Sequence, residues 1–391
     1  MSSVSAPPAY AALPGPAVDH CVANRGLLTQ PWSLLSNMSH QLTIEPLGAT
    51  IDVEEGQTML DAALRHGIYL PHACCHGLCG TCKVQIVDGE ADLGDANPFA
   101  LMDFEREEGK ALACCATLCT NTVIEAEIDE EPDAEVIPVK DFSAEVARIE
   151  RLTPTIIAVH LRLHQPIHFQ AGQYVQLEIP GLGQSRAFSI ANAPGKVATT
   201  GEIELNVRQV PGGQGTAYIH EKMRVDDRVR LAGPYGRFFV RKSANMPMVF
   251  MAGGSGLSSP RSMILSLLQG GCDLPITLVY GQRNATELYY DSEFRDMARL
   301  HPNFSYVPAL SEACGDSHLD VAYGFVHEAA KAHFGNDFSG HKAYLCGPPL
   351  MIDACITTLM QGRLFERDIY FEKFISAADA QQVRSPLFKR V

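Results

Sequence analysis

The spacing of hydrophobic and polar residues changes twice along this chain of 391 residues, and each change marks a different kind of structure. In the first region, short alternating runs surround one stretch of helical spacing, which Gly67 ends. This pattern predicts a small α+β domain of the β-grasp type. Its predicted elements are a hairpin around Gly48 formed by Leu42–Ile44 and Ile51–Val53, a helix over Thr58–Arg65, a strand over Lys83–Val87, a charged helix over Phe104–Glu108 and a closing strand over Thr122–Ala126.

From Lys140 the alternation becomes frequent and is interrupted by Pro and Gly turns, which predicts an antiparallel β-barrel. Its predicted strands are Phe142–Arg148, Ile156–Leu163, Tyr174–Ile179, Ala187–Ile190, Ile203–Arg208 and Arg228–Leu231. From Pro247 the chain instead repeats a strand, a glycine loop and a helix, which predicts a doubly wound α/β domain with a parallel sheet. The strands expected there are Met248–Met251, Ile276–Tyr280 and Ala343–Cys346.

These changes predict domains over residues 38–135, 140–242 and 245–391. Residues 1–37 are rich in Pro, Ala and Ser and almost uncharged, so we expect a disordered tail there. An alternative is that the physiological chain begins at Met38, because the first strand-like run follows at once. The acidic segment Asp129–Pro138 contains two prolines and is interpreted as a linker.

Charge is unevenly distributed along the chain. The formal net charge is −14, whereas residues 38–137 carry 20 acidic and four basic residues, a net of −16. An acidic module on a near-neutral body argues against nucleic acid as a partner. It serves either solubility alone or steering toward a positively charged redox partner. No apolar run reaches the ~18 residues that a membrane span needs. The chain does not begin with basic residues followed by an apolar core, so we do not expect a secretory signal.

The twelve cysteines cluster instead of spreading along the chain. Clustering indicates metal binding more than a disulfide scaffold, and a reducing compartment such as the cytoplasm. Four of them have the Cys-x4-Cys-x2-Cys…Cys spacing by which thiolates hold a plant-type [2Fe–2S] cluster. Gly77 and Gly80 permit the backbone angles and the close approach that a Cβ would block. The predicted ligands are Cys74, Cys79, Cys82 and Cys114.

Other metal centres fit this spacing less well. Zinc usually takes paired Cys-x2-Cys knuckles, and only Cys79 and Cys82 form one. A Rieske centre needs two histidines, and His76 has no counterpart near Cys114. Buried or disulfide-bonded cysteines would not call for the glycines in the loop.

The ligand assignment is ambiguous by one residue at each end, because Cys75 and Cys115 neighbour the proposed ligands. The four-residue gap favours Cys74, and the run that ends at Cys114 resembles the usual approach to a fourth ligand. On this assignment Cys75, Cys115 and Cys119 are spare thiols.

A glycine loop follows one predicted strand of the third domain and opens a helix, the context in which such a loop binds a dinucleotide. Its glycines are Gly253, Gly254 and Gly256. A second segment ends another strand, at the carboxyl edge where ligands bind in parallel sheets. It consists of Cys346, Gly347 and Pro348. Core packing is the alternative role for an isolated cysteine at this place.

The order of an iron–sulfur loop, a barrel and a nucleotide fold resembles the reductase components of bacterial multicomponent oxygenases. These belong to the ferredoxin–NADP⁺ reductase superfamily, and the nearest resemblance is to the reductases of phenol hydroxylases. The motifs that carry it run from the first domain to the last. They are Phe99–Asp103, Phe169–Val175, Ala252–Pro260, Tyr344–Pro349 and Gly362–Ile369.

The resemblance implies bound FAD. Arg186 begins a segment similar to the family's Arg-x-Tyr/Phe-Ser motif, and would supply a fixed cation for the FAD pyrophosphate. Ser189 would bond near flavin N5, while Phe188 would stack but lacks the hydroxyl of the tyrosine found in many relatives. A second motif would bring backbone N–H groups and a hydroxyl to the same pyrophosphate at a helix start. Its residues are Gly213, Gly215 and Thr216.

The resemblance also implies a nicotinamide substrate. Cys346 would lie beside the nicotinamide and set hydride-transfer geometry, and Phe374 would cover the flavin until nicotinamide displaces it. The 2′-phosphate of NADPH needs several cations for its binding. After the strand at Ile276–Tyr280 the chain offers a single arginine, Arg283, which is followed by the uncharged Asn284. We therefore expect NADH in preference to NADPH.

The function implied is an NADH-dependent oxidoreductase that passes electrons through FAD and a [2Fe–2S] cluster to the di-iron hydroxylase of a phenol-type aromatic monooxygenase. A reductase serving a ring-hydroxylating dioxygenase, or a toluene or alkane monooxygenase, is an alternative within the class. A redox-sensing regulator is less expected, because a sensor needs neither the flavin nor the nicotinamide motif. A structural subunit of a larger complex is a third alternative.

Overall fold

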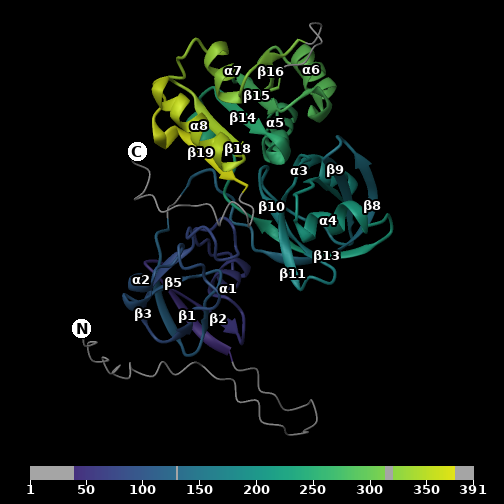
Figure 1. Ribbon diagram of the computed structural model, residues 1–391. Coiled ribbons are helices and arrows are strands. Elements are labelled where there is room, and N and C mark those ends of the chain that lie inside the picture. Colours follow the sequence, from purple (N-terminus) through teal and green to yellow (C-terminus); the bar gives the residue numbers. More distant parts are fainter. Residues whose placement is uncertain (1–38, 129–130, 313–319, 375–391) are drawn as a thin grey trace, which may run out of the picture.

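The computed structural model describes residues 39–128, 131–312 and 320–374, and the predicted tail at 1–37 lies outside these ranges. Three sheets form three bodies along the chain (Figure 1). The first body lies at the lower left of the view, the antiparallel barrel at the right and the parallel sheet at the top. The predicted fold class, a β-grasp domain followed by a barrel and a doubly wound domain, is confirmed.

The first sheet has the order β2-β1-β7-β3-β5. β7 (Thr122–Glu125), expected to close this sheet, lies at its centre, parallel to β1 and antiparallel to β3. Local alternation predicts a strand but not its neighbours, which depend on where the chain returns. The other strands are β1 (Ser39–Glu45), β2 (Ala49–Glu54), β3 (Lys83–Asp88) and β5 (Lys110–Leu112), with a two-stranded sheet of β4 (Ala91–Asp92) and β6 (Thr117–Leu118).

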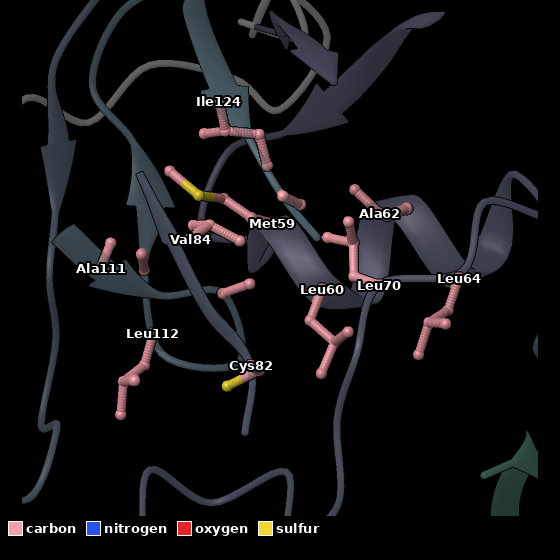
Figure 2. Close-up of a cluster of buried hydrophobic side chains, with 14 of the residues drawn as sticks. Met59, Leu60, Ala62, Leu64, Leu70, Cys82, Val84, Ala111, Leu112 and Ile124 are labelled. Carbon is pink, nitrogen blue, oxygen red and sulfur yellow. The ribbon is translucent and has the colours of Figure 1, made fainter. Parts of the chain in front are cut away.

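Helix α1 (Met59–Arg65) packs across this sheet and supplies its core. The Thr58 hydroxyl caps the helix by accepting a hydrogen bond from Asp61 N at 3.2 Å. Figure 2 shows Met59 of α1 close to Ile124 of β7, and both are fully buried. Burying a side chain of this size stabilises the fold by roughly 1.5–3 kcal/mol, so the helix and the central strand together hold the cysteine loop in place.

The second sheet is antiparallel throughout, in the order β11-β10-β13-β8-β9-β12. Its two edge strands meet at a bridge between Ile190 and Leu205, beside which Ala191 N donates to Glu204 O at 2.8 Å. The sheet is therefore curled into the predicted barrel. Its strands are β8 (Lys140–Arg151), β9 (Ile156–Leu163), β10 (Tyr174–Ile179), β11 (Gln184–Ser189), β12 (Glu202–Arg208) and β13 (Arg228–Tyr235).

The third sheet is parallel, in the order β17-β16-β15-β14-β18-β19. From β14 the chain moves outward to β17 and then returns to the other side of β14, so the switch point lies between β14 and β18. Ligands bind at such a point, outside the carboxyl ends of the strands. The strands are β14 (Met248–Gly253), β15 (Ile276–Gln282), β16 (Phe304–Leu310), β17 (Ala322–Tyr323), β18 (Lys342–Gly347) and β19 (Ile369–Lys373).

The longest helix of the described residues has 13 residues, and none in these ranges is long and apolar enough to cross a membrane. Besides α1, the α-helices are α2 (Asp103–Glu107), α3 (Pro194–Thr200), α4 (Gln214–Glu221), α5 (Ser258–Gln269), α6 (Asp291–Leu300), α7 (Val326–His333) and α8 (Pro349–Gln361), which is the longest.

The acidic segment between the first two domains is bonded to its surroundings over its described part. The Glu131 carboxylate pairs with Arg241 at 2.6 Å, and the Asp133 carboxylate accepts from the Ser243 hydroxyl at 2.6 Å. Gln170 Nε2 donates to the Asp133 carbonyl at 2.7 Å. The segment predicted as a linker is therefore bonded to the barrel domain and to the turn that leads from it to the third sheet.

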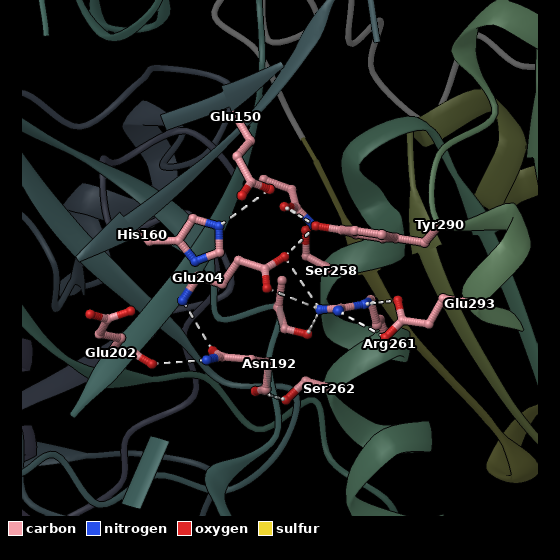
Figure 3. A network of polar contacts seen from close by, with 12 residues as sticks. Glu150, His160, Asn192, Glu202, Glu204, Ser258, Arg261, Ser262, Tyr290 and Glu293 are labelled. Atoms are coloured by element: carbon pink, nitrogen blue, oxygen red, sulfur yellow. Dashed lines mark hydrogen bonds and ion pairs between the residues drawn. The ribbon is translucent and has the colours of Figure 1, made fainter. Parts of the chain in front are cut away.

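A buried ion network joins the barrel to the parallel sheet (Figure 3). Arg261 on α5 is 8% exposed and Glu204 on β12 is 7% exposed. Arg261 Nη1 donates to both Glu204 carboxylate oxygens at 3.3 Å and to Ala191 O at 3.0 Å. Its Nε and Nη2 donate to the Glu293 carboxylate at 2.9 and 3.1 Å. A buried charge is tolerated only when it is paired and hydrogen-bonded in this way.

Tyr290 extends the same network. Its hydroxyl donates to Glu204, and its ring lies 4.1 Å from the Arg261 guanidinium. Its backbone has a φ of +58°, a left-handed conformation that is rare for a bulky residue and persists where the surroundings hold it. The adjacent Tyr289 donates its hydroxyl to Gly254 O at 3.1 Å. Two consecutive tyrosines therefore fix the barrel and the glycine loop relative to each other.

We expect Arg261→Met to destabilise the chain by about 3–5 kcal/mol, because it leaves the Glu204 carboxylate buried without its cation. Chemical denaturation followed by circular dichroism measures the change. Arg162→Met is the matched control, since Arg162 pairs with Glu202 at 2.7 Å at the surface, where a pair contributes about 0–1 kcal/mol. Equal losses in the two variants would contradict a structural role for the buried network.

Candidate functional site

The four predicted cluster ligands come together in two pairs. The Cys74 side chain lies within hydrogen-bonding reach of Cys79, and that of Cys82 within reach of Cys114. Within 39–128, 131–312 and 320–374, no three His, Cys, Asp or Glu side chains converge as ligands of one metal ion. Two pairs of thiols suit a two-iron cluster, in which each iron takes two thiolates.

Backbone N–H groups of the loop point at these sulfurs. His76 N and Leu78 N donate to Cys74 Sγ at 3.5 and 3.4 Å, and Gly77 N donates to Cys114 Sγ at 3.3 Å. Gly77 has a φ of +71° and makes this approach because it has no Cβ. Such donors stabilise bound thiolate and tune the potential of a cluster. The loop therefore fits the predicted [2Fe–2S] group in both ligands and donors.

The two ambiguous cysteines behave differently. Cys75 turns away with a φ of +57°, and its Sγ lies 3.3 Å from the Tyr174 hydroxyl of the barrel. Cys115 Sγ stays 3.7 Å from Cys114 Sγ, beside the ligand group. The geometry favours Cys74 over Cys75, and leaves Cys115 as the close neighbour of the fourth ligand.

On the barrel, Arg186 of β11 lies against the start of α4. A Cβ on Gly215 would be 3.1 Å from Arg186 Cγ, so the glycine makes room for the arginine. The guanidinium donates to Ser185 O and Gln184 Oε1, and the first turn of α4, with the N–H groups that a helix start leaves unpaired, lies beside the arginine. This cation beside a helix N-terminus fits a pyrophosphate.

Thr216 lies at the start of α4, in the turn that Gly213 begins. Its hydroxyl accepts from Val210 N at 3.1 Å and donates to Gly213 O at 3.2 Å, so it stabilises the turn before α4. A cavity of about 410 Å³ lies along one face of α4. It is lined by Pro180, Leu182, Gln214, Ala217, Tyr218 and Glu221 among others.

At the switch point of the parallel sheet, the glycine loop after β14 touches the end of β18. A Cβ on Gly256 would lie 2.5 Å from Cys346 O, and one on Gly253 would lie 2.3 Å from Met351 Sδ. Gly256 therefore requires glycine, because a Cβ there would meet backbone, whereas the flexible Met351 side chain can shift to admit a Cβ at Gly253. The loop also meets the barrel, since a Cβ on Gly254 would be 3.2 Å from Arg208 Nη1 of β12. The predicted Gly347 and Pro348 complete this edge, and Pro348 caps α8.

Cys346 belongs to a small cluster of polar side chains that the sequence did not reveal. It is fully buried, and its thiol donates to the Glu372 carboxylate at 3.8 Å. The Ser259 hydroxyl donates to the same oxygen at 3.2 Å. Burial raises the pKa of Cys346 well above its usual value and raises the pKa of Glu372 to about 7. A carboxyl within an edge strand gives no sequence signal, because only the pairing of β18 with β19 brings Glu372 opposite Cys346.

The remaining predicted residues lie near these two sites. Phe374 N donates to Gly347 O at 2.9 Å, which places the aromatic residue at the switch point. Ser189 ends β11 and pairs across the sheet with Tyr174, and Phe188 precedes it on the same strand. Ser189 is buried, while Phe188 is half-buried and packs on the barrel core.

Tyr174 joins the barrel to the cysteine loop, a role that the sequence did not reveal. Its hydroxyl donates to Ala73 O at 3.0 Å, and its ring stacks on Tyr235 with centroids 5.6 Å apart. Burial raises its pKa well above the usual value, so the hydroxyl remains a donor. His76 Nε2 lies 3.2 Å from Ser185 O of β11. The loop therefore rests on the strands that carry the flavin-motif residues.

A second set of contacts closes the rim of this junction. Arg65 of α1 donates to both Asp141 carboxylate oxygens at 2.9 Å, a bidentate pair of the stronger kind. The Arg237 guanidinium lies 3.9 Å from the Tyr69 ring centroid. The first domain is thus held to the barrel by charge as well as by aromatic packing.

One chain therefore carries three cofactor sites in series, the arrangement of a nicotinamide-dependent iron–sulfur flavoprotein. Residues 42–119 match the 2Fe-2S iron-sulfur cluster binding domain, residues 143–240 the oxidoreductase FAD-binding domain and residues 250–356 the oxidoreductase NAD-binding domain.

Known proteins share this organisation over their whole length. The reductase component of phenol 2-monooxygenase from Pseudomonas sp. strain CF600 is 56% identical over 356 residues, 90% of this chain and 100% of that protein. A phenol hydroxylase protein from Acinetobacter pittii is 54% identical, with the same shares covered. The crystal structure of the Amycolatopsis reductase GcoB superposes with a TM-score of 0.79 at 34% identity, covering 86% of this chain and 99% of that one.

The chain belongs to the family of phenol hydroxylase reductase components. It is an NADH-dependent oxidoreductase with FAD and a [2Fe–2S] cluster as its cofactors.

We expect Cys114→Ser to abolish the visible absorbance of the cluster, because one iron loses a thiolate. Cys115→Ser should retain that absorbance, since its sulfur lies beside the ligand group without belonging to it. Iron content and the electron paramagnetic resonance signal of the reduced protein provide the measurement. The reverse result, with Cys115 indispensable, would shift the fourth ligand by one residue.

Proposed function

We propose that this chain delivers electrons from NADH to the di-iron oxygenase component of an aromatic monooxygenase that hydroxylates phenol or a related compound. The observation that carries this proposal is the seating of the cysteine loop on the flavin-motif strands of the barrel through Tyr174 and His76. The names of the relatives support a phenol monooxygenase as the partner system and phenol as the substrate class, and the di-iron type of the oxygenase component is part of the proposal. A thiolate cluster suits a reducing compartment, so we place the chain in the cytoplasm.

The cofactors supply the redox chemistry: FAD accepts a hydride and releases single electrons, and the cluster carries them one at a time. The residues of the chain bind and orient these groups. Arg186 and the N-terminus of α4 would hold the FAD pyrophosphate. The sequence-predicted Ser189 and Phe188 would face the ring system at the end of β11, and Phe374 would lie at the nicotinamide edge.

At that edge, Cys346 and Glu372 would position the nicotinamide. Gly253 and Gly256 let the glycine loop pack closely on Met351 and on the end of β18, and the loop would bind the dinucleotide through its backbone at the start of the following helix. The buried Arg261–Glu204 pair fixes the barrel against this loop, and would thereby hold the nicotinamide site at a fixed distance from the flavin site. Orientation of this kind is the main contribution that a protein makes to hydride transfer.

The test is a comparison of two electron acceptors. With NADH, the purified chain should reduce both ferricyanide and cytochrome c, and NADPH should support much slower rates. Cys79→Ser should lose cluster absorbance and cytochrome c reduction while retaining NADH–ferricyanide activity through FAD. Loss of both activities together would show that the two sites do not work as separate modules. A chain that reduces cytochrome c only slowly would favour the sensor alternative.

We expect the rate of hydride transfer to rise about threefold or more between pH 6 and pH 8. The pKa of Glu372 is raised by burial to about 7, so its carboxyl gains a negative charge over this range. That charge stabilises the positive nicotinamide ring formed as hydride leaves. Stopped-flow bleaching of the flavin band measures the rate. Glu372→Gln should flatten the profile, and Glu366→Gln, on the surface, should leave it unchanged; a flat profile in the unaltered chain would contradict this role.

A further inference from the structure

An apolar patch on the first domain has no role in the sites described above. It consists of Phe99, Met102 and Phe104, and we call it the cluster-side patch. We propose that the oxygenase component docks on the cluster-side patch to collect electrons. This inference rests on the proposed function and gives its partner a place on the chain.

The cluster-side patch is exposed and rigidly supported. Phe99 is 70% exposed, Met102 38% and Phe104 54%. Its backbone is held from below by Arg106, which donates to Ala96 O at 3.0 Å and to Leu101 O at 3.4 Å. Two large aromatic side chains that are exposed to water lack the apolar contacts that the surface of a partner would supply. Exposed aromatics on a pre-organised segment are typical of binding surfaces.

The segment that carries the patch touches the cluster loop directly. Asn97 N donates to Gly77 O at 3.0 Å, and Phe99 N donates to Asn97 Oδ1 at 2.9 Å. A Cβ on Gly80 would lie 3.1 Å from Ala100 O, so the loop and the segment are in backbone contact. A protein bound to the patch is therefore separated from the cluster loop by a single layer of chain.

The barrel occupies a different side of the same loop. Cys75 and His76 face the barrel through Tyr174 and Ser185, and α1 faces it through Arg65. In Figure 1, α2 with the patch residue Phe104 lies on the side of the first domain away from the barrel. Electrons that enter from the barrel side can therefore leave on the side of the patch without any movement of the domains.

Charge around the patch defines the chemistry of its partner. Exposed acids flank its residues along the chain, at Asp92, Asp95, Asp103 and Glu107. The nearby cation Arg106 is directed inward to backbone carbonyls. The partner surface should therefore be an apolar recess with a basic rim. A second copy of this chain fits poorly, because a symmetric contact would place acids against acids.

The experiment measures electron delivery to a defined probe, the oxygenase component of the phenol monooxygenase from Pseudomonas sp. strain CF600. NADH is saturating, and the KM for the oxygenase component is determined from the rate of NADH-dependent phenol hydroxylation. Phe99→Gln combined with Phe104→Gln should raise this KM about tenfold or more and change kcat little. Asp103→Asn should raise it less and weaken its dependence on salt. Val87→Gln, at a residue 60% exposed on β3 of the same domain, should stay within about twofold of the unaltered chain.

Anaerobic reduction of the cluster by NADH, followed at its visible band, reports whether the domain is intact. The double variant should match the unaltered chain in this reaction, which a merely misfolded domain would not. A KM within about twofold of the unaltered chain in the double variant would overturn the docking surface, as would a dimer of the unaltered chain that dissociates on this substitution. If the unaltered chain reduces cytochrome c but gives no phenol hydroxylation, the proposed partner fails, and the assignment of this surface fails with it.

Discussion

The contact between the cysteine loop and the barrel is the constraint on which the rest of the structure depends. Single electrons move between fixed cofactors only when their carriers lie close together, so the loop has to rest on the flavin-binding strands. Tyr174 provides this contact, because it pairs with Ser189 in the barrel and donates its hydroxyl to Ala73 of the loop. The tyrosine pair and the Arg65–Asp141 ion pair then fix the angle of approach.

A comparable constraint operates at the other end of the path. The proposed nicotinamide edge is made by two glycine-containing turns that meet at the switch point, where a side chain at Gly256 would collide with the backbone of Cys346. Its distance from the barrel is held by the buried pair Arg261 and Glu204 and by the half-buried Tyr290. Such a network is costly to bury, and its value lies in specifying one arrangement of the two domains.

The sequence predicted most of the local structure. Strands β9 and β10 begin and end where alternation begins and ends. The limits of β11 were less accurate, because its outer half is polar and carries little alternation. β16 and β19 were not predicted, because Pro308 interrupts the run of β16 and the short β19 ends in two charged residues, both of which weaken a strand pattern.

By itself, the sequence determined the chemistry of the sites. Local patterns can be recognised without knowledge of the fold. They include the spacing of four cysteines, the glycines beside them and the arginine of the flavin motif. The tertiary structure alone decided which groups face one another: Glu372 beside Cys346, Tyr174 beside the cysteine loop, and β7 at the centre of its sheet. These contacts join residues 26 to 101 positions apart. Packing and burial bring such residues together, and the spacing of residues within a single segment predicts neither.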